Sequence, residues 1–274
     1  MKRPFLTRIL PNRLKRVLYY RWYRTRHSHF PGLFDNVSLE LAPQVSMHGL
    51  VVGDAISGSL AFLGFYEWDL SAKIVEMAGK ATTFVDVGAN MGYYSLLWAG
   101  TNPKGCVLAF EVSPRNITIL QNNIDRNNLT NQITVIPKAA GHHQGTMKFD
   151  VGPSEQTGWG GITSTSSATT IEVSMVRLDE ELPDIDIDVL KIDVEGADTW
   201  VLFGCEQLLR EKRIRTIFFE QNIGRMEVLG ITANEAVCLP RLTEPAPKGA
   251  ADPMGRGPRV AAARRRRGRR GPGG

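Results

Sequence analysis

TFVDVGANMGYYS, residues 83–95, places a short apolar run directly before a glycine-rich turn. The run from Thr83 to Val87 predicts a buried strand, and a helix is predicted from about Tyr93 to Ala99. Glycines after a strand let a ligand approach the backbone closely, and the next helix presents its N-terminal amides to an anion. The stretch therefore predicts a strand–turn–helix unit with a ligand at the turn.

The same alternation continues on the C-terminal side of this unit. A second apolar run, 106–110, ends at Glu111, and Ser113-Pro114 predicts the start of a helix that continues to about Arg126. Three further strands are predicted at 133–136, 187–192 and 216–219, with a helix over about 197–210. Alternating strands and helices predict an α/β fold with a mainly parallel sheet and helices on both faces. Residues 145–178 interrupt the alternation and predict an antiparallel excursion or flap.

Acids and glycines stand where the predicted strands end. In an open parallel sheet these ends meet at one rim, where ligands bind. Glu111 lies 19 residues after Gly92, at the end of the second strand. A carboxylate there can accept hydrogen bonds from both hydroxyls of a ribose. The pattern predicts a site for an adenosine-type ligand, with these candidate residues: Asp86, Gly88, Asn90, Gly92, Glu111 and Asp193.

The spacing of the turn discriminates between ligands. The dinucleotide fingerprint is G-x-G-x-x-G, whereas residues 86–92 read D-x-G-x-N-x-G. S-adenosylmethionine has no pyrophosphate and carries a sulfonium, an amino group and a carboxylate. An acid at the end of the first strand, Asp86, suits that ligand better than it suits a dinucleotide.

Three sequence blocks together resemble a known family. VDVGANMGYYS (85–95), AFE (109–111) and LKIDVEGA (190–197) are similar to the FkbM family of S-adenosylmethionine-dependent methyltransferases, over roughly residues 37–239. The resemblance implies a Rossmann-like class I methyltransferase fold and methyl transfer to a hydroxyl of a sugar, glycan or natural product. By position, residues 86–92 would hold the methionine part, Glu111 the ribose, and Asp193 would face the sulfonium and the acceptor.

The chain departs from the family pattern at three places. Val112 replaces the usual Pro, Asp198 replaces the usual Glu, and the closing antiparallel strands expected after about residue 239 are missing from the sequence pattern. The third departure leaves open a catalytically impaired module that only binds S-adenosylmethionine.

A hydroxyl acceptor is a poor nucleophile, so a general base would help the transfer. Asp193 and Glu195 are the first candidates for the catalytic base, and Glu220 is the next. The alternative for Glu195 is a carboxylate that caps the following helix near Gly196. No third ligand accompanies Asp193 and Glu195, so no metal is predicted.

Charge is distributed unevenly along the chain. Residues 1–30 carry nine Lys/Arg and no acid, residues 240–274 carry a net +8, and residues 31–239 carry a net −12. Because residues 31–239 are acidic, this part of the chain is poorly suited to bind the phosphate backbone of a nucleic acid. A nucleic-acid methyltransferase, suggested by the basic ends, is therefore the weaker alternative, and nucleic acid is not expected as a partner.

These patterns divide the chain into three segments. Residues 1–36 form a basic amphipathic segment, 37–239 the methyltransferase domain, and 240–274 an Arg/Gly/Pro/Ala-rich tail that is predicted to be disordered, as a nucleic-acid-binding tail or a frameshift product. A helix with Asn12 as its cap is predicted in the first segment. It either contacts an anionic membrane surface through residues 1–30 or packs on the domain itself.

Targeting signals are absent from the sequence pattern. No apolar run of about 18 residues occurs, no apolar segment suitable for secretion is present at the start, and the three Cys are scattered. The expectation is a cytoplasmic protein, with peripheral membrane contact left open. The oligomeric state is left open as well.

Overall fold

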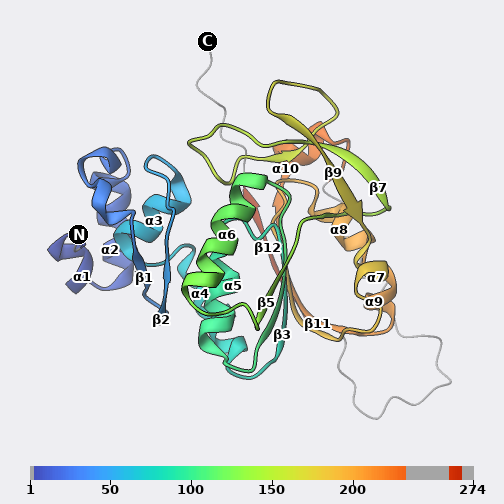
Figure 1. Ribbon diagram of the computed structural model, residues 1–274, viewed down its shortest axis with the longest axis horizontal. Coiled ribbons are helices and arrows are strands. Elements are labelled where there is room, and N and C mark those ends of the chain that lie inside the picture. The colour runs from blue at the N-terminus through green and yellow to red at the C-terminus, as the bar shows by residue number, and fades with distance from the viewer. Residues whose placement is uncertain (1–2, 233–258, 267–274) are drawn as a thin grey trace.

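The computed structural model describes residues 3–232 and 259–266 of the 274-residue chain. Its centre is a sheet in the order β12-β11-β10-β3-β4-β5, in which every described neighbour pair is parallel (Figure 1). The strands are β3 (Thr83–Val87), β4 (Cys106–Phe110), β5 (Ile133–Ile136), β10 (Ile187–Ile192), β11 (Ile214–Asn222) and β12 (Arg259–Arg266). The strand order reverses at β3, because β4 and β5 lie on one side and β10 and β11 on the other.

Helices cover both faces of this sheet, as the alternation predicts. Side chains of β3 alternate between two cores: Phe84 packs with Trp98 and Leu97 on one face, and Val85 packs with Val201 and other apolar side chains on the opposite face. The helices on the first face are α4 (Trp68–Ala78), α5 (Tyr93–Thr101) and α6 (Pro114–Arg126), and those on the second are α7 (Leu178–Glu181), α8 (Asp198–Phe203) and α9 (Glu206–Arg210) (Figure 1).

The predicted antiparallel excursion is confirmed as a small second sheet in the order β6-β9-β7-β8. Its strands are β6 (Ala139–Ala140), β7 (Gly145–Asp150), β8 (Gly161–Ile162) and β9 (Thr170–Val176). β7 pairs antiparallel with both β9 and β8. The loop between β7 and β8 reaches back over the carboxyl end of the central sheet.

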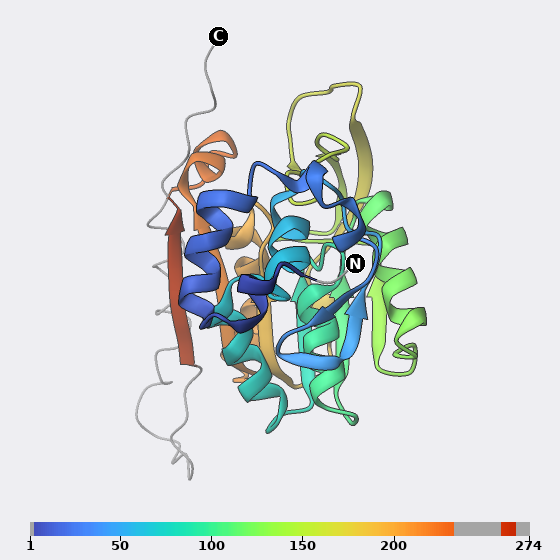
Figure 2. The same cartoon turned by 90° about the vertical axis from the view of Figure 1, so that its left-hand side faces the viewer.

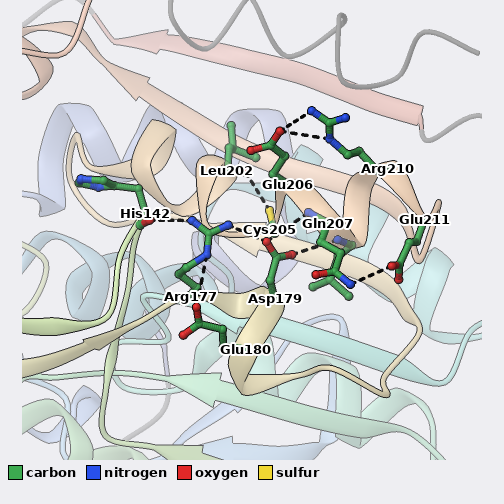
Figure 3. A network of polar contacts seen from close by, with 11 residues as sticks. His142, Arg177, Asp179, Glu180, Leu202, Cys205, Glu206, Gln207, Arg210 and Glu211 are labelled. Atoms are coloured by element: carbon green, nitrogen blue, oxygen red, sulfur yellow. Dashed lines mark hydrogen bonds and ion pairs between the residues drawn. The ribbon is translucent and has the colours of Figure 1, made fainter. Parts of the chain in front are cut away.

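The helix predicted over about 197–210 is in fact two helices, α8 and α9, separated at Gly204-Cys205. A Cβ on Gly204 would lie 2.0 Å from the Gly141 carbonyl oxygen, so the backbones meet there too closely for any other residue. α9 begins anew because the Asp179 carboxylate accepts hydrogen bonds from the N–H groups of Gln207 and Leu208 (Figure 3).

The first part of the chain packs beside the central domain. It comprises α1 (Phe5–Ile9), α2 (Asn12–Leu18), a π-helical turn (Tyr19–Tyr23), two 3-10 turns (His27–His29 and Pro31–Leu33), the hairpin β1 (Val37–Leu39) and β2 (Ala42–Met47), and α3 (Ala55–Leu63). Asn12 is the first residue of α2, whose cap position is Pro11, so the predicted Asn12 cap is not formed. Tyr19, Tyr23 and Phe30 surround Phe62 of α3, which joins this segment to the main core.

The C-terminal part is described at two places. β11 extends beyond the predicted 216–219 and is followed by α10 (Ile223–Val228). The tail from residue 240 was predicted to be disordered, and over eight of its residues this prediction is wrong. These residues form β12, which pairs in parallel with β11 at the edge of the sheet. The rest of 233–274, including Cys238, lies outside the described residues, and the three segment boundaries stay predictions. Across the described ranges, no helix is both long and apolar enough to cross a bilayer.

Candidate functional site

The ends of three neighbouring strands are tied together by backbone hydrogen bonds. The N–H groups of Gly88 and Ala89 both donate to the Phe110 carbonyl at 3.0 Å, and the Asp193 N–H donates to the Val87 carbonyl at 3.0 Å. Gly88 has a φ of 77°, and a Cβ there would lie 2.0 Å from the Asp193 carbonyl oxygen. Gly88 is therefore required for two reasons, its left-handed backbone and the close approach of β10.

Glu111 is held at the end of β4 by three backbone donors. Its Oε2 accepts from the Asn90 N–H at 2.7 Å, and its Oε1 accepts from the N–H groups of Ser113 at 2.8 Å and Val112 at 3.0 Å. Burial raises the pKa of Glu111, and the three N–H donors oppose that shift. The carboxylate is thus fixed in one orientation at the edge of a cavity, as recognition of a diol requires.

A cavity opens at this rim. Its walls come from the glycine-rich turn, the ends of β4 and β10, and the loop between β7 and β8. Four side chains that line it each hold a buried oxygen that has no hydrogen-bond partner among the described residues: Asn90 Oδ1, Ser113 Oγ, Asn116 Oδ1 and Thr157 Oγ1. Buried polar atoms are almost always satisfied, so this concentration indicates a polar ligand such as a nucleoside.

The structure sorts the predicted site residues into two groups. Gly88, Asn90, Glu111, Asp193 and Glu195 all line the cavity.

Asp86 and Gly92 do not line it. Asp86 is fully buried, and its carboxylate accepts from the Ser95 hydroxyl at 2.8 Å and from the Lys191 ammonium at 3.1 Å. A Cβ on Gly92 would lie 2.4 Å from Cδ1 of Leu120, so this glycine permits packing against α6. The ligand contact expected of these two residues stays a prediction, and in this structure both lie behind the cavity wall.

Lys191 is a site residue that the sequence reasoning did not single out. Its ammonium lies 3.1 Å from Asp86 Oδ1, 3.3 Å from the Gly88 carbonyl and 3.8 Å from Asp193 Oδ2. Burial opposes its charge, yet the carboxylates of Asp86 and Asp193 outweigh burial and raise the pKa of Lys191. The sequence feature that could have identified Lys191 is its position in the last, otherwise apolar half of the strand predicted at 187–192.

Glu195 does not cap the helix that follows it. The cap position of α8 is Ala197, which forms no side-chain cap hydrogen bond, and Asp198, the first residue of the helix, accepts from the Gly196 N–H at 3.2 Å. The Glu195 Oε2 instead accepts from the Asn222 side chain at 3.1 Å and lies 3.8 Å from Arg225 Nε. Of the two interpretations of Glu195, the structure supports a cavity carboxylate held from β11 and α10.

The loop 153–157 forms one wall of the cavity. The Arg115 guanidinium donates to the carbonyls of Pro153 at 3.0 Å, Ser154 at 2.6 Å and Gln156 at 3.1 Å. The Thr157 N–H donates to Asp54 Oδ1 at 3.0 Å, and the Asn116 side chain donates to the Thr157 carbonyl at 3.0 Å. Trp159, further along the chain between β7 and β8, also lines the cavity. The His142 ring does not line it and lies 4.9 Å from the Trp200 ring, tilted by 56°.

Replacing Arg115 by Met is expected to lower the affinity for an adenosine-type ligand about tenfold, because three hydrogen bonds of about 1 kcal/mol each that hold the loop are lost. Titration calorimetry with S-adenosylhomocysteine measures the change. Arg126→Met, at the exposed end of the same helix, is the matched control. Equal affinity of the two variants would contradict the role given to the loop.

A second cavity adjoins the first and shares Lys191 and Asp193 with it. It combines four acids, one lysine and four apolar side chains: Glu67, Asp69, Leu70, Lys191, Ile192, Asp193, Phe218, Phe219 and Glu220. The Tyr94 hydroxyl donates to Glu67 at 3.1 Å, which ties this wall to α5. Two adjoining cavities that meet at Asp193 suit a reaction between two ligands.

Comparisons with known proteins agree with this arrangement. Residues 86–228 match the family model described as Methyltransferase FkbM domain. A stretch of 146 residues is 30% identical to "Hexuronic acid methyltransferase AglP" of Haloferax volcanii, covering 53% of this chain and 58% of that protein. The chain thus spans under two thirds of the length of that relative.

Among solved structures, the FkbM methyltransferase of Methylobacillus flagellatus has a TM-score of 0.36 and 22% identity, over 49% of this chain and 32% of that chain. The precorrin-6y C5,15-methyltransferase of Geobacter metallireducens has a TM-score of 0.34 and 13% identity, over 57% of this chain and 62% of that chain.

Proposed function

The chain belongs to the FkbM methyltransferase family, and from that premise we propose that it transfers a methyl group from S-adenosylmethionine to a hydroxyl of a sugar, glycan or natural product. The observation that carries the proposal is the meeting of Glu111, the Gly88 turn and Asp193 at one cavity, with a second cavity behind Asp193.

The charges and hydrogen-bonding groups of the first cavity suit the methyl donor. Asp86, Lys191 and Asp193 together carry one net negative charge, which favours a sulfonium cation near Asp193. Glu111 would accept hydrogen bonds from the ribose hydroxyls, and Asn90 offers a buried oxygen beside it. Asp86 would act through Lys191, whose position it fixes. When bound, S-adenosylmethionine supplies an activated methyl group with a neutral thioether as leaving group.

The second cavity fits a polyhydroxylated acceptor. Carboxylates accept hydrogen bonds from hydroxyl groups, and the rings of Phe218 and Phe219 offer apolar surface for the C–H face of a sugar. The relative named for hexuronic acid supports a sugar acceptor. The acidic lining, which includes Glu67, Asp69 and Glu220, favours a neutral or cationic sugar over a uronate in this chain.

Asp193 would act as the general base, a role supported by its position in the lining of both cavities. Its carboxylate would take the proton of the attacking hydroxyl, while the oxygen forms a bond to the methyl carbon and the sulfur keeps the electron pair of the breaking bond. Alignment of the two reactants supplies the larger part of such a rate enhancement, about 7–11 kcal/mol in favourable cases. Glu195 remains the alternative base.

The test of this function is transfer of an isotopically labelled methyl group from S-adenosylmethionine. The acceptors are neutral glycosides, amino sugars and uronates, with RNA as the comparison. Label in a neutral or amino sugar supports the proposal. Label in RNA alone, or no product although the donor binds, would overturn it.

Replacing Glu111 by Gln is expected to lower the affinity for S-adenosylhomocysteine about thirtyfold, because hydrogen bonds to a charged acceptor are worth about 1.5–3 kcal/mol each. The specific readout is the 2′-deoxy analogue. The parent should bind the ribose form much more tightly than the deoxy form, and the variant should lose that preference. A variant that keeps the full preference would show that Glu111 does not contact the ribose.

A further inference from the structure

Exposed apolar side chains are concentrated at one place on the molecule. Among the described residues, ten large apolar side chains are exposed, and seven of them lie between residues 5 and 22. We call this set the N-terminal apolar surface; its exposed fractions range from 46% to 63%, and its members are Phe5, Leu6, Ile9, Leu14, Val17, Tyr20 and Trp22. Such a concentration of exposed apolar residues in one segment points to an interaction site.

The opposite side of the same helices is already packed. Lys15 is buried and donates to Glu40 at 2.8 Å, and the buried Tyr19 hydroxyl shares a hydrogen bond of 3.1 Å with His27. The Tyr19 and Phe62 rings lie 5.7 Å apart. The two interpretations of this segment are therefore not alternatives, because its inner face packs on the domain while its outer face stays apolar and exposed. In Figure 2 these helices face the viewer in front of the domain.

Exposed basic side chains lie in the same segment as the apolar surface. Arg8, Arg13, Arg21, Arg24 and Arg26 are all exposed. The guanidinium of Arg8 lies over the Phe5 ring and that of Arg26 over the Trp22 ring, at 5.7 and 5.4 Å. The first acidic residue of the chain is Asp35, whereas residues 31–239 carry a net −12. The segment that carries this surface, residues 1–30, thus contributes nine positive charges and no negative charge.

We propose that the N-terminal apolar surface docks on an anionic phospholipid bilayer. Charge complementarity selects this partner: arginines pair with lipid phosphates while the apolar side chains between them enter the headgroup region. Trp22 and Tyr20 are the side-chain types that prefer that depth, with an apolar ring and a polar edge. The contact is peripheral and independent of the proposed methyl transfer.

Flotation of the full chain with phospholipid vesicles tests the proposal. The protein is expected to float with phosphatidylcholine vesicles containing about 30% phosphatidylserine, and to stay in solution with phosphatidylcholine alone. Arg13→Gln/Arg21→Gln should lower the partition coefficient about thirtyfold, since each basic residue near the surface contributes about a factor of five. The matched control is Lys80→Gln/Lys104→Gln, which removes the same charge from exposed positions elsewhere.

The apolar contribution is tested by Val17→Glu against Val228→Glu. Both valines are exposed, at 57% and 79%, so neither substitution disturbs the core. Only Val17→Glu should abolish flotation, and both variants should keep the melting temperature of the parent. Equal flotation of the two variants, or no flotation of the parent, would overturn the proposal. So would a concentration-dependent dimer that Val17→Glu dissociates, because a second copy would then cover this surface.

Discussion

Asp193→Asn is expected to lower the methyl-transfer rate about 10²- to 10⁴-fold, the usual contribution of a positioned general base. Asn keeps the size of the side chain but cannot accept the proton. Binding of S-adenosylhomocysteine, which carries no sulfonium charge, should stay close to that of the parent. Single-turnover transfer and titration calorimetry measure the two quantities separately.

Two further variants make this result specific. Asp69→Asn removes a carboxylate from the same second cavity at a side chain that is 84% exposed, and it should leave the chemical step nearly unchanged. Glu195→Gln distinguishes the two candidate bases. If Glu195→Gln caused the larger loss and Asp193→Asn a small one, the base would be Glu195, which Asn222 and Arg225 hold in place.

Gly88→Ala is expected to destabilise the fold by more than about 4 kcal/mol, a loss seen only for severe core or backbone conflicts. A left-handed φ costs an alanine about 1–2 kcal/mol. The larger part comes from overlap, because the new Cβ would lie 2.0 Å from the Asp193 carbonyl oxygen, a backbone atom that cannot rotate away. For a domain of this size, the melting temperature should fall by about 10 °C.

Gly53→Ala is the control that separates these two causes. Gly53 also has a positive φ, 98°, and a Cβ there meets nothing within 4 Å among the described residues. It should lose only the smaller, conformational part. Thermal unfolding of both variants gives the comparison, and a similar loss at the two positions would mean that β10 moves away from the turn at little cost.

The sequence predicted the central sheet well because its strands have simple local signals. The runs at 83–87, 106–110, 133–136 and 187–192 coincide with β3, β4, β5 and β10, and each carries apolar residues on both faces, as buried parallel strands do. The helix at 197–210 was wrongly predicted as continuous. The break at Gly204 comes from its close contact with the Gly141 backbone, which is distant in the sequence.

The site was predicted in part for a similar reason. Glu111 and Asp193 follow their strands directly, so strand ends alone bring them to the rim. Asp86 was predicted to contact the ligand because it belongs to the same motif. Its carboxylate instead accepts hydrogen bonds from Ser95 of α5 and from Lys191 of β10. Side chains alternate between the two faces of β3, so the position of Asp86 in the strand fixes the face on which its side chain lies. The sequence does not reveal that α5 covers this face.

The hydrogen bonds that join the turn after β3 to the ends of β4 and β10 have an evolutionary consequence. Phe110, Gly88 and Asp193 come from separate stretches of the chain. Their backbone atoms nevertheless contact one another at the ends of three neighbouring strands. A change of loop length or backbone path in any one block displaces the other two. The three blocks should therefore be inherited as a single unit, while the acceptor wall around Phe218 is free to diversify.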